Sequence, residues 1–194
     1  MAGSKESALC PTARPAWAHH ESMKLLAISG SLREGSLNTR LLRALDGLVG
    51  DVSVTIYDGV GNLPHLNVDF DTEDAPIAIQ EFRKQLVEAD AVVISSPEYA
   101  HGIPGSFKNA LDWVVSSGEF VDKPVLLVNV ASTGGERAQA QIVQVLKVMT
   151  ANVVEAVGFT SAKVRNGIAE DGAFNDSELR AILESAVRNL AASA

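Results

Sequence analysis

Short apolar segments alternate with longer amphipathic segments through most of this 194-residue chain. Continuous apolar or β-branched runs predict five strands, at residues 24–29, 52–57, 91–96, 124–130 and 152–159. Apolar residues at helical spacing predict five helices, at residues 38–49, 76–89, 104–116, 136–150 and 176–192. Strands that alternate with helices form a parallel sheet, because each helix carries the chain back across it. The pattern therefore predicts an α/β fold with helices on both faces of a five-stranded parallel sheet.

The same pattern predicts one domain, residues 23–194, with no internal linker or repeat. Residues 1–22 differ, because they are rich in Ala, Ser and Pro and show no sustained period. They also lack the continuous apolar centre of a signal peptide. We expect a disordered N-terminal extension, an upstream start or a cloning remnant there. Residues 58–75 and 160–175 contain glycines and many polar side chains, and are expected to be surface loops.

The composition restricts the classes of partner. A formal net charge of −8 disfavours nucleic acid, and it requires any anionic ligand to be held by local groups. The single cysteine, Cys10, cannot form an internal disulfide, and no Cys/His cluster has metal-ligand spacing. No apolar run approaches the ~18 residues of a membrane span. These features predict a cytoplasmic protein with no metal, nucleic-acid or membrane partner.

An anion-binding loop is predicted between the first strand and the first helix, at residues 29–38. Backbone N–H groups at such a junction favour an anion. The loop adds the hydroxyls of Ser31 and Ser36, the amide of Asn38 and the guanidinium of Arg33. Several donors and one fixed charge in fork geometry are what a terminal phosphate dianion requires.

Two better-known phosphate motifs do not fit this loop. A P-loop needs a lysine at the position of Ser36. The dinucleotide fingerprint needs a second glycine two residues after Gly30, where this chain has Leu32. A hydroxyl-rich loop suits a monophosphate better than a pyrophosphate, which needs close backbone approach. The alternative is an ordinary strand-to-helix turn with polar capping residues.

Two further loops follow the third and fourth predicted strands, at residues 96–105 and 131–137. If the strands lie in the order 2-1-3-4-5, the ends of strands one and three flank the topological switch point, and all three loops reach one crevice. The first of these loops offers Tyr99 and Ile103 as a surface for a planar ring, and the second offers two hydroxyls and two glycines.

Two titratable residues in the loop after strand three have alternative roles. His101 is a candidate general acid, although a loop histidine is more often a polar surface or capping group. Glu98 is a candidate base, but it can equally bind a backbone amide or pair with a neighbouring subunit. No side chain is assigned a catalytic role from the sequence.

Two motifs together resemble one family. G-S-L-R-x-x-S-x-N at Gly30–Asn38 and P-E-Y-x-x-x-I-P-G-x-x-K-N-A-L-D-W at Pro97–Trp113 resemble the NADPH-dependent FMN reductases, which include bacterial quinone, chromate and azo-dye reductases. The resemblance covers essentially all of residues 23–192. It implies a flavodoxin-like three-layer sandwich with strand order 2-1-3-4-5, one FMN per subunit, and a homodimer or homotetramer that completes the site across an interface.

The resemblance also implies which residues hold FMN. Those expected at the phosphate and ribityl chain are Ser31, Arg33, Ser36, Leu37 and Asn38. Those expected along the flavin ring are Pro97, Glu98, Tyr99, Ala100 and His101, and those at its other edge are Ser132, Thr133, Gly134 and Gly135. Many relatives have Asn where this chain has Ala100, so a side-chain amide is missing near the flavin.

The activity implied is an FMN-dependent NAD(P)H oxidoreductase. Hydride passes from NADPH or NADH to FMN and then to a small-molecule acceptor such as a quinone, chromate or an azo compound, in a ping-pong scheme. The alternative is a flavodoxin-type electron carrier without its own substrate, although such a carrier usually lacks an arginine at the position of Arg33. A third alternative is an α/β protein that binds no flavin.

Overall fold

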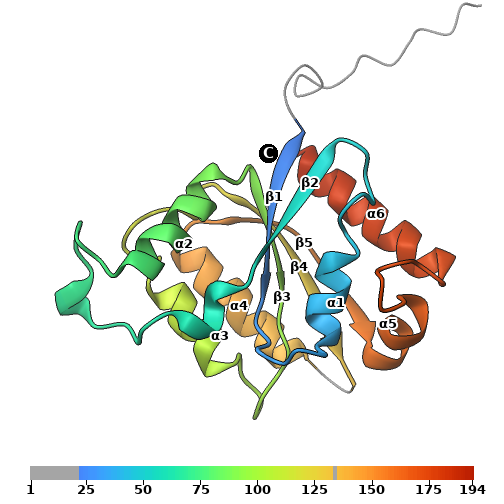
Figure 1. Ribbon diagram of the computed structural model, residues 1–194, viewed down its shortest axis with the longest axis horizontal. Coiled ribbons are helices and arrows are strands. Elements are labelled where there is room, and N and C mark those ends of the chain that lie inside the picture. Colours follow the sequence, from blue (N-terminus) through green and yellow to red (C-terminus); the bar gives the residue numbers. More distant parts are fainter. Residues whose placement is uncertain (1–21, 133–134) are drawn as a thin grey trace, which may run out of the picture.

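The computed structural model describes residues 22–132 and 135–194. Its centre is a parallel sheet of five strands in the order β2-β1-β3-β4-β5 (Figure 1). The strands are β1 (Met23–Ser29), β2 (Val52–Tyr57), β3 (Ala91–Ser95), β4 (Pro124–Ala131) and β5 (Asn152–Thr160). The predicted fold class and strand order are confirmed.

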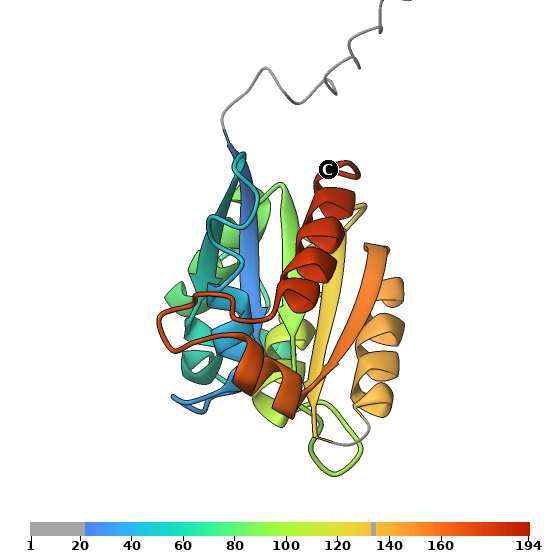
Figure 2. The ribbon, with the colours of Figure 1, turned by 90° about the vertical axis from the view of Figure 1, so that its right-hand side faces the viewer.

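Helices cover both faces of the sheet and bury a separate core on each side. One face carries α1 (Leu37–Arg43), α5 (Ser161–Gly167) and α6 (Ser177–Ala191), which face the viewer in Figure 2. The opposite face carries α2 (Ile77–Glu88), α3 (Gly105–Asp112) and α4 (Glu136–Val148). Successive residues of β3 alternate between the cores: Val93 packs with the first set and Val92 with the second. This explains why the central strands are apolar without interruption.

Two predicted segments differ in the structure. The helix expected at residues 38–49 ends at Arg43, and the chain continues in turns with Gly47 at φ +70°. The loop expected at residues 160–175 contains α5, whose N-cap Thr160 accepts a hydrogen bond from the Lys163 N–H at 3.1 Å. A seven-residue helix makes only two turns, so it shows no apolar period in the sequence.

The segment between β2 and α2 projects from the body of the protein (left in Figure 1). It contains two short 3₁₀ turns, Gly59–Asn62 and Val68–Phe70. The buried Trp113 side chain donates its indole N–H to the carbonyl of Pro64 at 2.8 Å, so this tryptophan anchors the projection.

The N-terminal prediction is untested, because residues 1–21 lie outside the described part of the chain. Ser22 is described and directly precedes β1. Among the described helices, none has the length and apolar character required to cross a membrane.

Candidate functional site

A cavity of about 880 Å³ lies at the carboxyl ends of β1, β3, β4 and β5. Nine of the predicted site residues line it: Ser31, Arg33, Ser36, Leu37, Asn38, Pro97, Glu98, Tyr99 and Ser132. Ala100, His101 and Gly135 are not among its lining residues. The predicted Thr133 and Gly134 lie outside the described residues. Segments from all three predicted loops therefore meet at one crevice, at the topological switch point.

The first loop is held in shape by its own side chains. The buried Ser36 hydroxyl caps α1 by accepting the Thr39 N–H at 3.4 Å. The buried Asn38 accepts a hydrogen bond at Oδ1 from the Ser95 hydroxyl at 2.8 Å, which ties the loop to the end of β3. The contact leaves the Nδ2 donors of the Asn38 amide for a ligand.

The exposed Arg33 guanidinium lines the same part of the cavity and makes no ion pair with any described carboxylate. Its backbone N–H donates to the Ser31 hydroxyl at 3.4 Å. The loop thus offers two hydroxyls, an amide donor and a guanidinium to the cavity. This donor set fits a phosphate monoester.

The loop after β3 is a two-residue hairpin turn at the mouth of the cavity. Tyr99 and Gly102 exchange two backbone hydrogen bonds of 2.9 Å. The two residues between them have left-handed backbones, with φ +48° at Ala100 and +63° at His101. The turn places Tyr99 along the cavity with half of its surface exposed, whereas Ile103 packs partly against the α2–α3–α4 core. Tyr99 is therefore the aromatic surface available to a planar ring.

Glu98 links this hairpin to the N-terminus of α4. Its Oε2 accepts the backbone N–H groups of Arg137 and Ala138, each at 3.1 Å. Its Oε1 lies 3.3 Å from Nδ1 of the exposed His101. The hydrogen bond from Ala138, assisted by those from His101 and Arg137, lowers the pKa of Glu98. The backbone-amide contact, one of the predicted alternatives for Glu98, is present in the structure. A lowered pKa makes a carboxylate a weaker base.

The loop after β4 is described at Ser132 and again from Gly135. Ser132 donates its hydroxyl to that of Ser161 at 3.3 Å, so it contacts the start of α5. Gly135 precedes α4 with φ +94°, and a Cβ there would lie 2.3 Å from Nδ2 of Asn129. Only glycine fits this position.

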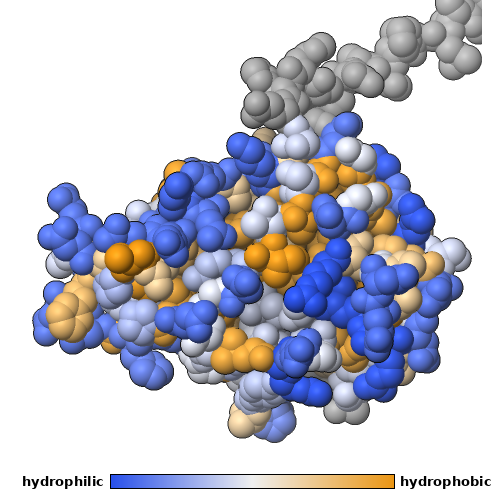
Figure 3. All heavy atoms as spheres, in the orientation of Figure 1, coloured by the Kyte–Doolittle hydropathy of each residue, from blue (hydrophilic) through white to orange (hydrophobic). Residues whose placement is uncertain are grey.

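The sequence analysis missed one side of the cavity. This side is formed by Arg40 of α1, Ser161 and Arg165 of α5, and the segment Ile168, Ala169 and Glu170. Arg40 lies one helical turn beyond Ser36, so helix geometry already placed it beside the first loop. No comparable signal identified the residues of α5, because their segment was interpreted as an irregular surface loop. In Figure 3 strongly hydrophilic residues gather at the lower right, where α1 and α5 lie.

Comparison with known proteins identifies the family. Residues 23–165 match the NADPH-dependent FMN reductases. The chain belongs to the NADPH-dependent FMN reductase family. An NAD(P)H-dependent FMN reductase of Pseudomonas aeruginosa is 30% identical over 175 residues, which cover 88% of this chain and 94% of the relative. A quinone reductase of Escherichia coli is 29% identical over 154 residues, covering 76% of this chain and 82% of the relative.

A solved structure shares the same architecture. It is FerB, a flavoenzyme NAD(P)H:(acceptor) oxidoreductase from Paracoccus denitrificans, with a TM-score of 0.70 and 26% identity. The match covers 87% of this chain and 97% of FerB. Family membership makes this FMN reductase an oxidoreductase that uses FMN with NAD(P)H, as the two sequence motifs predicted. It also favours the enzyme over the electron-carrier alternative.

Proposed function

We propose that this FMN reductase binds FMN in the cavity at the carboxyl ends of its strands and transfers electrons from NAD(P)H to a quinone. The proposal rests mainly on one observation: three loops that are distant in sequence place phosphate donors and an aromatic side chain around one cavity of about 880 Å³. That volume is near the upper end of the range of about 300–1,000 Å³ typical of small-molecule sites. It leaves room for a second ligand beside FMN.

The predicted residues divide the binding of FMN between them. Arg33 and the hydroxyls of Ser31 and Ser36 hold its phosphate, with the Asn38 amide and the backbone at Leu37 along the ribityl chain. Pro97, Glu98, Tyr99, Ala100 and His101 flank the ring on one side, and Ser132, Thr133, Gly134 and Gly135 on the other.

The protein's own part in the reaction is binding and orientation. When bound, FMN supplies the flavin that accepts hydride from NAD(P)H and passes electrons to the acceptor. Tyr99 provides an aromatic surface at the mouth of the cavity, where it excludes water from one side of a ring. Glu98 keeps the hairpin turn against α4 and does not accept a substrate proton, because its ionised form is already stabilised.

A quinone is the favoured acceptor because it takes two electrons as a planar ring that suits the same cleft, and because the E. coli relative is a quinone reductase. Chromate and azo compounds are secondary candidates. The proposal includes assembly into a homodimer or homotetramer and a cytoplasmic location. Residues 1–22 are proposed to be an extension that precedes the FMN-binding domain. The exposed position of Tyr99 supports completion of the site by a second subunit.

Anaerobic mixing tests the proposal. The FMN-loaded protein is mixed with NADPH or NADH, and flavin absorbance is followed before and after addition of a quinone. We expect rapid bleaching by the nucleotide and recovery of absorbance with the quinone. Absence of bleaching, together with a stable one-electron-reduced flavin on chemical reduction, would support the electron carrier instead. Protein that takes up no FMN would contradict both.

A further inference from the structure

The cavity extends past the three predicted loops to a side formed by α5 and the hairpin that follows it. Ile168 pairs with Phe174 in an antiparallel bridge, and Ala169 donates its N–H to the carbonyl of Ala173 at 2.8 Å. Arg40 of α1 donates to the carbonyl of Ile168 at 3.5 Å. Backbone hydrogen bonds therefore hold this side of the cavity together, and Arg40 joins it to α1.

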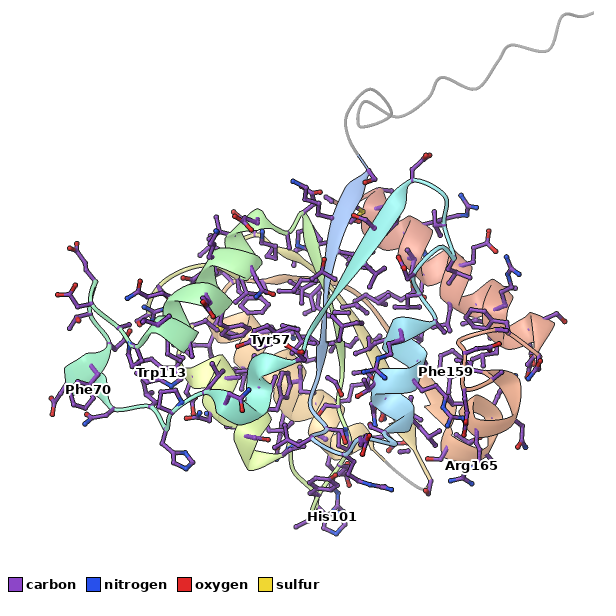
Figure 4. All side chains as sticks on the ribbon, in the orientation of Figure 1. Tyr57, Phe70, His101, Trp113, Phe159 and Arg165 are labelled. Carbon is purple, nitrogen blue, oxygen red and sulfur yellow. The ribbon has the colours of Figure 1, made fainter. Side chains whose placement is uncertain are left out.

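Two guanidinium groups line this side, in a protein whose net charge is −8. Arg40 is partly engaged, since it contacts Ile168 and lies 3.8 Å from the Glu170 carboxylate, whose side chain is 93% exposed. Arg165 lines the cavity from α5 and makes no ion pair with any described carboxylate. In Figure 4, Arg165 lies at the lower edge of the molecule, the edge that also carries His101. Its charge is available to a ligand.

We propose that Arg165, together with Arg40 on the same side of the cavity, binds the 2′-phosphate of NADPH and makes this FMN reductase select NADPH over NADH. The inference rests on the proposed function, because it assigns FMN to the three predicted loops and the nucleotide to the remaining space. NADPH and NADH differ only in a phosphate ester on one ribose. A guanidinium binds such a dianion through two parallel N–H donors, whereas a ribose hydroxyl gains little from it.

The phosphate of FMN has its own donors at Arg33, Ser31 and Ser36, so Arg165 is not needed to neutralise it. The charges of Arg165 and Glu170 should have opposite effects on the affinity for a 2′-phosphate. Removing the charge of Arg165 weakens the attraction for a 2′-phosphate, and removing the opposing charge of Glu170 strengthens it. Because these side chains are exposed, both effects decrease as salt rises.

The test uses the FMN-loaded protein and four chains: wild type, Arg165→Gln, Glu170→Gln and the control Arg43→Gln. Arg43 lies on α1, as Arg40 does, but it is exposed and does not line the cavity. Its variant therefore loses one positive charge outside the cavity. Calorimetry measures binding of 2′,5′-ADP and of 5′-AMP to the oxidised protein. Steady-state kinetics give KM for NADPH and for NADH, and flavin fluorescence gives the FMN dissociation constant.

We expect Arg165→Gln to weaken 2′,5′-ADP about tenfold and to raise KM for NADPH by a similar factor. Binding of 5′-AMP, KM for NADH and FMN affinity should stay within error of wild type. Glu170→Gln should tighten 2′,5′-ADP, and Arg43→Gln should match wild type in every measurement.

Three results would overturn the inference. In the first, the wild type binds 2′,5′-ADP no better than 5′-AMP. In the second, Arg165→Gln weakens both nucleotides equally, which assigns the arginine to a shared phosphate. In the third, the variant loses FMN affinity instead, which assigns it to the flavin phosphate. Flavin that neither nucleotide reduces would contradict the proposed function, whereas the binding measurements would still report on Arg165.

Discussion

The carboxylate of Glu98 accepts the backbone N–H of Ala138 at 3.1 Å and thereby joins the hairpin turn after β3 to the first turn of α4. A second such bond, from the Arg137 N–H, has the same length. These two segments lie forty residues apart along the chain, and the contact fixes their spacing at the mouth of the cavity. The consequences of this contact can be tested separately from those of the phosphate loop.

Replacing Glu98 should loosen the ring side of the cavity without affecting the phosphate side. Glu98→Ala removes the side-chain oxygen that accepts both backbone N–H groups. We expect weaker binding of FMN and of riboflavin by the same factor, about tenfold, because riboflavin lacks the phosphate but keeps the ring. Glu98→Gln keeps one acceptor oxygen and should lie between Ala and wild type. Fluorescence titration measures both affinities. Glu81→Ala is the control, since this exposed carboxylate lies on α2 and does not line the cavity. Unchanged riboflavin binding in Glu98→Ala would contradict the assigned role.

The same carboxyl predicts a pH dependence of stability. Its pKa in the folded protein lies below the ordinary value of 4.5, chiefly because of the hydrogen bond from Ala138. A group with a lowered folded pKa stabilises the protein above its unfolded pKa, and this contribution is lost as pH falls through the folded pKa. The difference in unfolding free energy between wild type and Glu98→Gln should therefore be constant near neutral pH and shrink below pH 4.5. Denaturant unfolding at several pH values measures it, and a pH-independent difference would count against the contact.

Arg33→Ala should affect FMN and riboflavin differently. Loss of the charge-assisted contact should weaken FMN by about tenfold or more and leave riboflavin unchanged. Arg43→Ala provides the matched control on α1, outside the cavity. Equal FMN affinity in the two variants would show that the phosphate lies elsewhere.

Two glycines of the first loop should respond in opposite ways to alanine. A Cβ on Gly30 would lie 2.3 Å from the Ser96 hydroxyl and 3.1 Å from the Ser96 Cα, so β1 and β3 would have to separate at their carboxyl ends. We expect Gly30→Ala to lower the unfolding free energy by about 1–3 kcal/mol. Gly35→Ala meets nothing within 4 Å and should be nearly neutral. Thermal unfolding compares them, and equal stability would contradict the close approach of the two strands.

Ala100 stores strain, since its φ is +48°. Asparagine and glycine adopt this conformation readily, whereas a β-branched residue does not. Ala100→Asn should raise the unfolding free energy by about 0.5–1 kcal/mol, and Ala100→Val should lower it. Chemical denaturation of the two variants measures the effect. If Val were tolerated as well as Asn, the turn would not have the left-handed backbone described above.

Much of this fold follows from local sequence. The apolar strands predict the parallel sheet because β1, β3 and β4 are buried on both faces, which leaves no polar alternation to interpret. The first loop is recognisable because Ser31, Arg33 and Ser36 gather donors at a strand-to-helix junction. These features depend on neighbouring residues alone.

The remainder depends on contacts that sequence spacing does not show. α5 is too short to display a helical period, so the sequence did not predict that Arg165 lies on a helix beside the cavity. Glu98 binds the N-terminus of α4 at residues 137 and 138, and local spacing does not show that these segments lie side by side. In both cases the deciding partner is far away along the chain.

The cavity is lined by residues from Ser31 to Glu170, drawn from the connections that follow four different strands. A ligand that spans it therefore acts as a removable cross-link between segments that are far apart in sequence. The segments that the ligand bridges pack against two separate cores. Separation of these segments by heat, or their cleavage by proteases, should therefore require the ligand to leave first. Loss of FMN and global unfolding are then coupled, so the melting temperature should rise with the concentration of FMN.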